Sequence, residues 1–288
     1  MPRLFCFGLG YTALALTRRL RTDGWQIAGT CREADKAAAL RADGIDAVAA
    51  DGDRPPADPD GLIAGATHLL ASVPPDATGD PTLALWAPAI ARHPGLDWVG
   101  YLSTTGVYGD RDGDWVDEAS PLAPTGERGQ RRRDAEAAWS ALLPRVPVHL
   151  FRLAGIYGPG RSALDTVRAG RAQRVVKPGQ VFSRVHVEDI GQVLAASIAR
   201  PRPGAIYNVC DDNPAPPDEV IAFACDLLGV APPPAVPFDQ AGLSRMARSF
   251  YADNKRVSNR LIKEELGVHL IYPDYRMGLE ALSADRAS

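Results

Sequence analysis

A short apolar segment, 4–7, ends at two closely spaced glycines and is followed at once by a helical pattern, an arrangement that constrains the fold more than any other part of the chain. Gly8, Gly10 and Ala13 have the spacing G-x-G-x-x-A. The first glycine permits a tight turn, the second removes a side chain where a diphosphate would approach, and the small third residue lets helix and strand pack closely. Free backbone amides and the positive end of the helix dipole then favour an anion. The segment predicts a dinucleotide-binding turn; alternatively, the glycines only form a turn.

Strand and helix patterns alternate along the next hundred residues. Strands are expected at 25–30, 45–50, 68–73 and 97–104, and helices at 33–43, 82–93 and after 124. Strands that alternate with helices are typical of a parallel sheet covered on both faces. We therefore expect a doubly wound α/β fold. Pro88 is expected to kink or break the helix that contains it.

The bulk properties exclude several classes of protein. The chain has 288 residues, a net charge of -3 and 45% hydrophobic residues, so a nucleic-acid-binding surface spread over the whole protein is not expected. Four cysteines, Cys6, Cys31, Cys210 and Cys225, lack the spacing of a metal site or a disulfide framework, and the first two are expected in the core. Because a leader pattern and an apolar run of ~18 residues are absent, we expect a cytoplasmic protein without a membrane partner.

Residues after the second and third expected strands bear on the choice of dinucleotide. In such folds an acidic residue at the end of the second strand holds a 2′-hydroxyl, whereas a nearby Arg accepts a 2′-phosphate. Cys31 ends this strand and Arg32 follows, which favours NADP over NAD; alternatively, Arg32 only begins the next helix and Glu33 is the acid. Asp51, with Gly52, is placed to meet the adenine edge, or it caps a turn.

Hydroxyl side chains gather where the fifth expected strand ends. Ser103, Thr104 and Thr105 are consecutive there and precede the sequence GVYG. In an open parallel sheet, ligands bind outside the carboxyl ends of the strands. Ser72 and Val73, at the end of the fourth strand, belong to the same edge. These residues are therefore candidates for a ligand site.

Five segments resemble the extended branch of the short-chain dehydrogenase/reductase superfamily, the nucleotide-sugar epimerases and dehydratases. They occur in the family's order and at about its spacings, and the resemblance covers essentially the whole chain. The segments are 8–13, 103–109, 152–160, 185–190 and 206–209. The resemblance implies a Rossmann domain at 1–157, to which 185–210 returns, and a small carboxyl-terminal α/β substrate lobe made by 158–184 and 211–288. It also implies an NADP or NAD cofactor and a small-molecule substrate such as a nucleotide sugar.

The chain departs from this family where the family's chemistry resides. The family uses a Tyr and, four residues later, a Lys, with a Ser or Thr at the end of the preceding strand. Alignment of Glu136 with the family's glutamate places Arg132 at the Lys position and Arg128 at the Tyr position, and Thr104 supplies the hydroxyl. An Arg cannot be deprotonated in a protein, so Arg128 cannot replace the phenol. The phosphate loop also departs from the family's spacing, and we expect an atypical member.

Two interpretations of these arginines are open. Since Arg128 and Arg132 are four residues apart on an expected helix, they share a face and can direct two guanidinium groups at the cofactor or at a substrate phosphate or carboxylate. Alternatively, they form a solvated helix face of mixed charge together with Arg131, Arg133 and Glu136.

The carboxyl-terminal third is expected to build the substrate lobe. Arg161 and Arg184 lie in expected substrate loops, where they meet a phosphate or are ordinary surface arginines. His186 and Asp189 resemble a family pair whose role is mainly structural. The sequence predicts a helix at 218–228, a stiff proline-rich connector at 231–237 and an amphipathic helix formed by Val257, Leu261, Ile262, Glu265 and Leu266.

These patterns predict an NAD(P)-binding oxidoreductase or epimerase/dehydratase-like protein without the usual dyad, in which Tyr108, Tyr157 or water would have to carry the proton. The alternative is a non-catalytic NADP(H)-binding sensor or scaffold. No nucleic acid and no metal is expected, and the family's habit allows a homodimer through the helix that holds Arg128. The candidate catalytic residues are Thr104, Arg128 and Arg132, and the candidate cofactor-binding residues are Gly8, Gly10, Tyr11, Thr12, Ala13, Arg32, Asp51, Gly52, Ser72, Val73 and Ser103.

Overall fold

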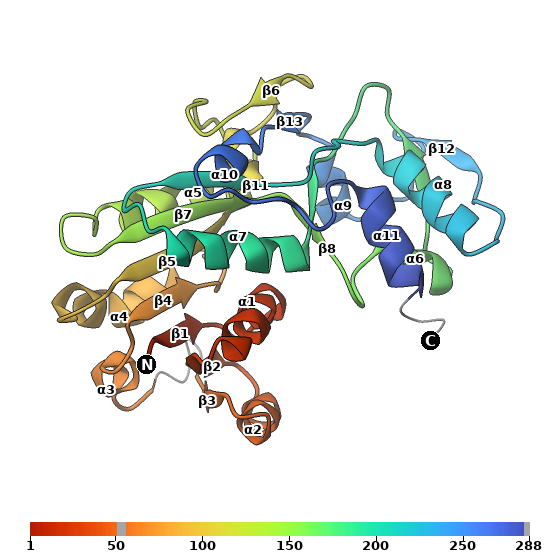
Figure 1. Ribbon diagram of the computed structural model, residues 1–288. Coiled ribbons are helices and arrows are strands. Elements are labelled where there is room, and N and C mark those ends of the chain that lie inside the picture. Colours follow the sequence, from red (N-terminus) through yellow and green to blue (C-terminus); the bar gives the residue numbers. More distant parts are fainter. Residues whose placement is uncertain (51–55, 285–288) are drawn as a thin grey trace.

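The computed structural model describes residues 1–50 and 56–284 and is organised around one parallel sheet (Figure 1). Its seven strands lie in the order β11-β7-β5-β4-β1-β2-β3, and every neighbouring pair is parallel. The strands are β1 (Arg3–Phe7), β2 (Gln26–Cys31), β3 (Asp46–Ala49), β4 (His68–Ala71), β5 (Trp98–Thr104), β7 (Val148–Leu153) and β11 (Ile206–Val209). The expected doubly wound α/β fold is confirmed, and the strand order reverses between β1 and β4.

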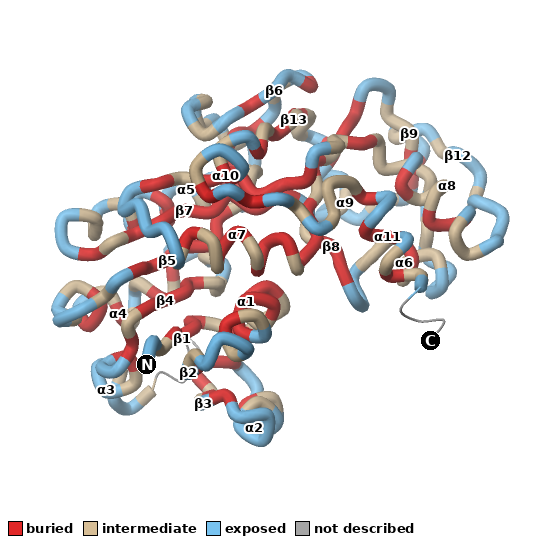
Figure 2. Tube along the Cα trace, in the orientation of Figure 1, coloured by how far each residue is buried: buried red, intermediate tan, exposed pale blue. Residues whose placement is uncertain are grey.

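Helices cover both faces of this sheet, because each face is apolar. On one face lie α1 (Tyr11–Thr22), α2 (Ala34–Ala42) and α7 (Val187–Ala199), and on the other lie α3 (Pro59–Ile63), α4 (Pro81–Arg92) and α5 (Glu127–Ser140). Leu16 and Val193 belong to the first core cluster, and Trp86 and Trp139 to the second. Figure 2 shows buried residues along the strands of the sheet and along the inner sides of α1 and α7.

Helix packing is closest between α1 and α7. A Cβ at Gly191 would lie only 3.2 Å from the backbone of Ala15, so glycine permits this approach. On the opposite face, α4 begins at a cap, where Asp80 accepts a hydrogen bond from the Leu83 amide at 3.0 Å. Pro88 lies inside α4, which continues through it to Arg92, so the expected break does not occur.

The carboxyl-terminal segments form a second layer of small elements beside the sheet (Figure 1). Strands β8 (Gly155–Tyr157) and β10 (Arg184–His186) pair with each other, as do β9 (Arg174–Val176) and β12 (Ala235–Pro237), and β6 (Trp115–Val116) and β13 (Arg256–Val257). The helices here are α6 (Ala163–Arg168), α8 (Pro217–Leu227), α9 (Arg245–Phe250), α10 (Arg260–Glu264) and α11 (Tyr275–Ala284). Leu164, Tyr275 and Leu279 belong to a separate apolar cluster, which gives this region its own small core.

Two local expectations for this region are wrong. Val257 does not belong to an amphipathic helix, because it pairs with Val116 in the β6–β13 ladder and only Arg260–Glu264 is helical. The expected stiff connector is partly a strand, since Ala235–Pro237 pairs with β9. Both errors arise from pairing with distant segments, which local periodicity does not report.

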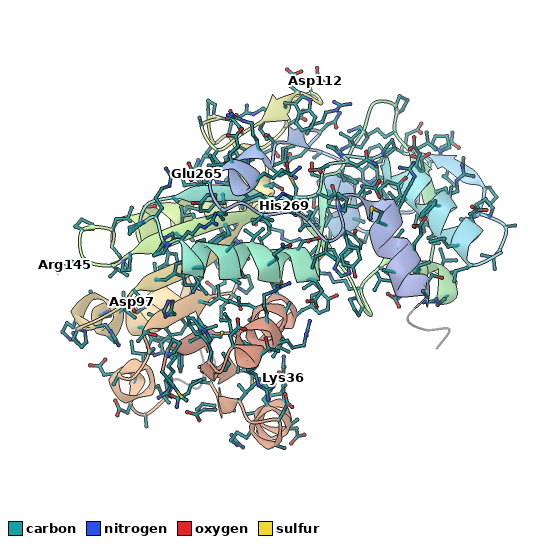
Figure 3. The ribbon with its side chains drawn as sticks, viewed as in Figure 1. Lys36, Asp97, Asp112, Arg145, Glu265 and His269 are labelled. Carbon is teal, nitrogen blue, oxygen red and sulfur yellow. The ribbon has the colours of Figure 1, made fainter. Side chains whose placement is uncertain are left out.

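Exposed charges such as Asp97, Asp112 and Arg145 project from peripheral loops (Figure 3). Over residues 1–50 and 56–284, no helix combines the length and the apolar character needed to cross a membrane.

Candidate functional site

The β1–α1 turn lies where the strand order reverses, and both neighbouring strands hold it in place. The Gly8 amide donates to Thr30 Oγ1 in β2 at 3.1 Å, and Ser72 Oγ, after β4, donates to the Gly8 carbonyl at 2.5 Å. Gly8 has φ +90°, and a Cβ there would lie 2.9 Å from Ser72 Oγ and 3.0 Å from Val73 Cγ2. Glycine is therefore required at position 8 by the turn itself.

Gly10 shows the opposite behaviour. Its φ of -92° suits any residue, and a Cβ at this position would meet no atom within 4 Å. It immediately precedes α1, which has no acidic residue in its first turn and, in the described part of the chain, no side-chain cap. Amides at a helix start carry partial positive charge and need acceptors. The space beside Gly10 therefore suits an anion, and these residues fit a dinucleotide's diphosphate.

The first turn of α1 is covered by a loop from the second layer. Tyr11 Oη donates to the Pro159 carbonyl at 3.1 Å, and the Arg161 guanidinium lies 5.9 Å from the centre of the Tyr11 ring. Thr12 and Ala13 are buried and pack the helix against the sheet. Of the predicted cofactor-binding residues, this places Gly8, Gly10, Tyr11, Thr12, Ala13, Ser72 and Val73 at the start of α1 or beside its turn.

The predicted selectivity residues lie at the ends of β2 and β3. The Arg32 side chain is 80% exposed, and its Nε lies 3.8 Å from Glu33 Oε1. Arg32 and Glu33, the two residues considered for selecting between NADP and NAD, are thus both on the surface and adjacent to each other. Asp51 and Gly52 lie outside the described residues.

The hydroxyls at the end of β5 have different environments. Thr104 is partly exposed, and its Oγ1 accepts a hydrogen bond from the Gly106 amide at 3.2 Å. Ser103 is buried, and its hydroxyl donates to Glu136 Oε1 of α5 at 2.5 Å. The structure therefore leaves Thr104 nearer to solvent and commits Ser103 to a buried contact with α5.

Ser103 belongs to a buried polar network that the sequence analysis did not anticipate. Arg152 of β7 forms an ion pair with Glu136 at 2.8 Å, and its Nη1 donates to Tyr108 Oη at 2.9 Å. Tyr108 in turn donates to Asn208 Oδ1 of β11 at 2.7 Å. Burial lowers the pKa of Arg152, but hydrogen bonds and charge from Glu136 outweigh it and raise the pKa overall. The one sequence signal was an Arg inside the run 148–153, whose other residues apart from His149 are apolar.

Comparisons with known proteins add relatives of the whole chain. No family model matches. The protein YeeZ of Escherichia coli K12 is 29% identical over 95% of this chain and 97% of its own length. A functionally unknown conserved protein from Silicibacter pomeroyi DSS is 56% identical, with full coverage of both chains and a TM-score of 0.91.

Other solved structures share the fold. A structure described as an NAD-dependent epimerase/dehydratase from Methylobacillus flagellatus is 26% identical, covers 100% of this chain and 99% of its own, and has a TM-score of 0.71. A dTDP-glucose 4,6-dehydratase from Bacillus anthracis in complex with NAD is 16% identical over 100% of this chain and 96% of its own, with a TM-score of 0.80. MoeE5 in complex with UDP-glucose and NAD is 18% identical over 100% of this chain and 99% of its own, with a TM-score of 0.78. The chain therefore shares its whole fold with NAD-dependent epimerases and dehydratases of the extended short-chain dehydrogenase/reductase type. The resemblance inferred from the sequence is confirmed.

Tyrosines near the carboxyl edge of the sheet do not offer this family's usual proton donor. Burial raises the pKa of Tyr101 and of Tyr108, each to about 12, and neither ring is exposed. Burial also raises the pKa of Tyr157, which is 7% exposed. A phenol with a raised pKa in a closed environment does not exchange protons with a ligand at neutral pH. In this chain, Tyr108 and Tyr157 are therefore poor substitutes for the tyrosine that the resemblance leads one to expect.

The two candidate arginines of α5 contact different neighbours. Arg132 Nη1 donates to the Leu102 carbonyl of β5 at 2.5 Å and to Tyr101 Oη at 3.3 Å. The Arg128 guanidinium lies 5.5 Å from the centre of the Phe250 ring in α9. Arg132 thus joins α5 to the sheet, whereas Arg128 faces the carboxyl-terminal layer. Contact of either arginine with a cofactor remains a prediction.

The residues that resemble the family's structural pair make structural contacts here. Asp189 accepts hydrogen bonds from the Ile271 and Tyr272 amides at 2.6 and 3.0 Å. His186 Nδ1 accepts from the Glu188 amide at 3.3 Å at the start of α7. These contacts anchor the segment that leads into α11.

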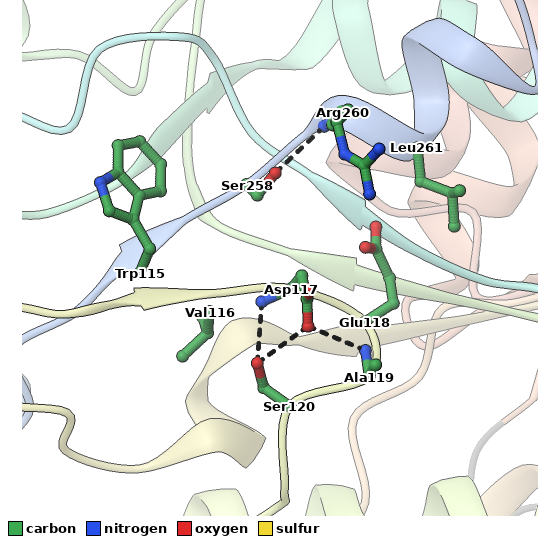
Figure 4. Close-up of a pocket in the computed structure, with 9 residues that line it drawn as sticks. All are labelled: Trp115, Val116, Asp117, Glu118, Ala119, Ser120, Ser258, Arg260 and Leu261. Carbon is green, nitrogen blue, oxygen red and sulfur yellow. Dashed lines mark hydrogen bonds between the residues drawn. The ribbon is translucent and has the colours of Figure 1, made fainter.

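A pocket of about 400 Å³ lies away from the β1–α1 turn (Figure 4). It is formed by β6, the loop that follows it and the start of α10. Glu118 lines it and also accepts a hydrogen bond from the Asn208 amide of β11 at 2.8 Å. Its lining residues are Trp115, Val116, Asp117, Glu118, Ala119, Ser120, Ser258, Arg260 and Leu261. None of them belongs to β1, β2 or β4, so this pocket is separate from the candidate dinucleotide site.

Proposed function

We propose that this protein binds NAD(H) or NADP(H) at the β1–α1 turn and uses it in oxidoreductase or epimerase/dehydratase-like chemistry on a small polar substrate. The observation that carries the proposal is the open space beside Gly10 at the uncapped start of α1, where the strand order reverses. Fold neighbours crystallised with NAD and UDP-glucose support this cofactor and suggest a nucleotide sugar as the first substrate class to test.

Roles follow from the position of each group. Amides at the start of α1 would hold the diphosphate, while Ser72 and Thr30 keep Gly8 in its turn. Arg32, exposed at the end of β2, would meet a 2′-phosphate and so favour NADP. When bound, the nicotinamide supplies the hydride acceptor or donor. Thr104 would donate a hydrogen bond to the substrate oxygen at the end of β5.

The division of the chain into two functional parts is also a proposal. Residues 1–157, with 185–210, would bind the dinucleotide, and 158–184 with 211–288 would bind the substrate. The separate apolar cluster around Leu164 and Tyr275 supports this division. A homodimer through α5, which holds Arg128, and its neighbouring helix remains a prediction, as does a cytoplasmic location. Free, buried Cys6, Cys31, Cys210 and Cys225 are compatible with a reducing compartment.

Titration calorimetry of the purified protein with NADH and NADPH tests the first step. We expect a saturable site for at least one of them, with NADPH favoured. Absence of binding to both would refute the proposal. Turnover is then tested by following the reduced-nicotinamide absorbance while candidate sugar nucleotides are added to the oxidised-cofactor complex.

A second function, a non-catalytic NADP(H) sensor or scaffold, is favoured by one observation. The tyrosines that the sequence left as proton donors are enclosed. Replacing Thr104 with Val separates the two functions. Loss of turnover with unchanged cofactor affinity supports an enzyme, whereas a protein that binds cofactor and shows no turnover before or after the change supports a sensor.

A further inference from the structure

Arg128 differs from the other arginines of α5 in having no polar partner in the described part of the chain. Arg131 pairs with Glu127 at 3.1 Å, Arg133 with Asp134 at 2.9 Å, and Arg132 donates to the Leu102 carbonyl. Arg128 is exposed, and its recorded neighbour is the Phe250 ring, 5.5 Å from the guanidinium carbon. Its charge is therefore available to a ligand.

The first turn of α5 lies against the turn that follows β5. A Cβ at Gly129 would lie 2.7 Å from the Gly106 carbonyl oxygen, and the Gly106 amide donates to Thr104 Oγ1 at 3.2 Å. Arg128 immediately precedes Gly129, the residue that makes this close contact. The exposed cation is thus held beside the strand end that carries the candidate substrate-binding hydroxyl.

Phe250 lies beside the Arg128 guanidinium, and the segment that follows it is anchored to the loop before α5 and to the turn after β5. Three residues after α9 ends, Asp253 accepts a hydrogen bond from Thr125, which lies two residues before α5. Lys255 Nζ then donates to the Gly109 carbonyl at 2.6 Å and to Asp253 Oδ2 at 3.1 Å. These contacts join the carboxyl-terminal layer to both ends of the 109–125 segment. Although so anchored, Phe250 remains 55% exposed.

An exposed guanidinium beside an aromatic ring suits a particular ligand chemistry. Arg cannot donate its proton as a phenol does, but its planar fork binds a carboxylate through two parallel hydrogen bonds. An apolar wall on one side excludes water and strengthens such a pair relative to open solvent. Stacking on the ring also restricts the guanidinium's orientation.

We propose that Arg128 selects a substrate whose sugar carries a carboxylate, a uronic acid attached to a nucleotide, over the corresponding neutral sugar. The inference rests on the proposed function, because it assumes that the substrate lies beside Thr104. Arg128 is a specificity residue that holds the carboxylate, and Phe250 is the wall that orients it.

UDP-glucuronic acid and UDP-glucose form a matched pair of probes, because they differ only at the sugar's C6. We expect the protein loaded with oxidised cofactor to bind UDP-glucuronic acid at least tenfold more tightly in calorimetry. Arg128→Ala should abolish this preference, and Arg128→Lys, which keeps the charge without the fork, should retain part of it. Phe250→Leu should reduce it. Arg131→Ala is the matched control on the same helix and should leave the preference intact.

Equal affinity for the two probes would overturn the inference, as would a preference that survives in Arg128→Ala. Failure of both probes to bind, in a protein that still binds NADH or NADPH, would overturn it as well while leaving the cofactor proposal standing. Failure to bind either dinucleotide would instead refute the proposed function, and the inference with it.

Discussion

The two glycines of the β1–α1 turn should respond oppositely to the same substitution. Gly8→Ala forces a Cβ into a backbone with φ +90° and to within 2.9 Å of Ser72 Oγ. A left-handed conformation costs a non-glycine residue about 1–2 kcal/mol, and the crowding adds to this. We therefore expect a loss of about 2 kcal/mol in the free energy of unfolding, equivalent to a fall in Tm of roughly 4–8 °C. At Gly10, with φ -92° and open space, Ala or Val should change stability by less than about 0.5 kcal/mol.

Cofactor affinity should be affected by substitution at Gly10, the position where stability is expected to change little. A side chain at position 10 occupies the space proposed for the diphosphate, so Gly10→Val should weaken NADH or NADPH binding at least tenfold, about 1.4 kcal/mol or more. Urea unfolding and dinucleotide titration on the same preparations give both quantities. A Gly10→Val protein that is folded and binds the dinucleotide as the parent does would refute the placement of the diphosphate. An unchanged Tm in Gly8→Ala would refute the account of the turn.

Three further outcomes are expected. Arg152→Met should lower the free energy of unfolding in urea titrations by about 3–5 kcal/mol, because it leaves the buried Glu136 carboxylate without its partner. Arg131→Ala removes an exposed pair and should cost less than about 1 kcal/mol. Equal effects of the two substitutions would contradict the buried network. Burial lowers the pKa of His149 and of His186 from 6.5 to about 4, and each neutral ring accepts a hydrogen bond from a backbone amide. Because the unfolded chain binds more protons than the folded one between these two values, the free energy of unfolding should be at its full value above pH 6.5 and fall as the pH drops toward 4. A flat profile of the unfolding free energy between pH 4 and 6.5 would contradict this expectation. Arg32→Ala should weaken NADPH binding while sparing NADH, and a parallel loss for both would exclude Arg32 as the selector.

The fold could be predicted because its signals are local. The spacing of Gly8, Gly10 and Ala13, directly between a strand pattern and a helix pattern, identified the turn that the structure places at the reversal of strand order. Alternating patterns located the strands β1 to β5, whereas β7 and β11 were not predicted as strands from their own patterns. The order of the resembling segments then identified the superfamily.

The residues that surround the candidate site were less accessible to sequence reasoning. Arg152 was visible as a charge in an apolar strand, but its partners Glu136 and Tyr108 lie 16 and 44 residues away along the chain. Nothing local indicated that Phe250 would face Arg128, because this contact depends on how the carboxyl-terminal layer folds back. Val257 was assigned to a helix for the same reason, since its strand partner Val116 is distant in sequence.

Glu118 has a consequence for the edge of the sheet. Strand β11 ends the sheet, and the backbone groups on its free side are a template on which another chain can add a strand. The Asn208 amide on that side already donates a hydrogen bond to the carboxylate of Glu118. Together with α10, which packs against the same strand, Glu118 therefore leaves this amide with no vacancy for a further strand.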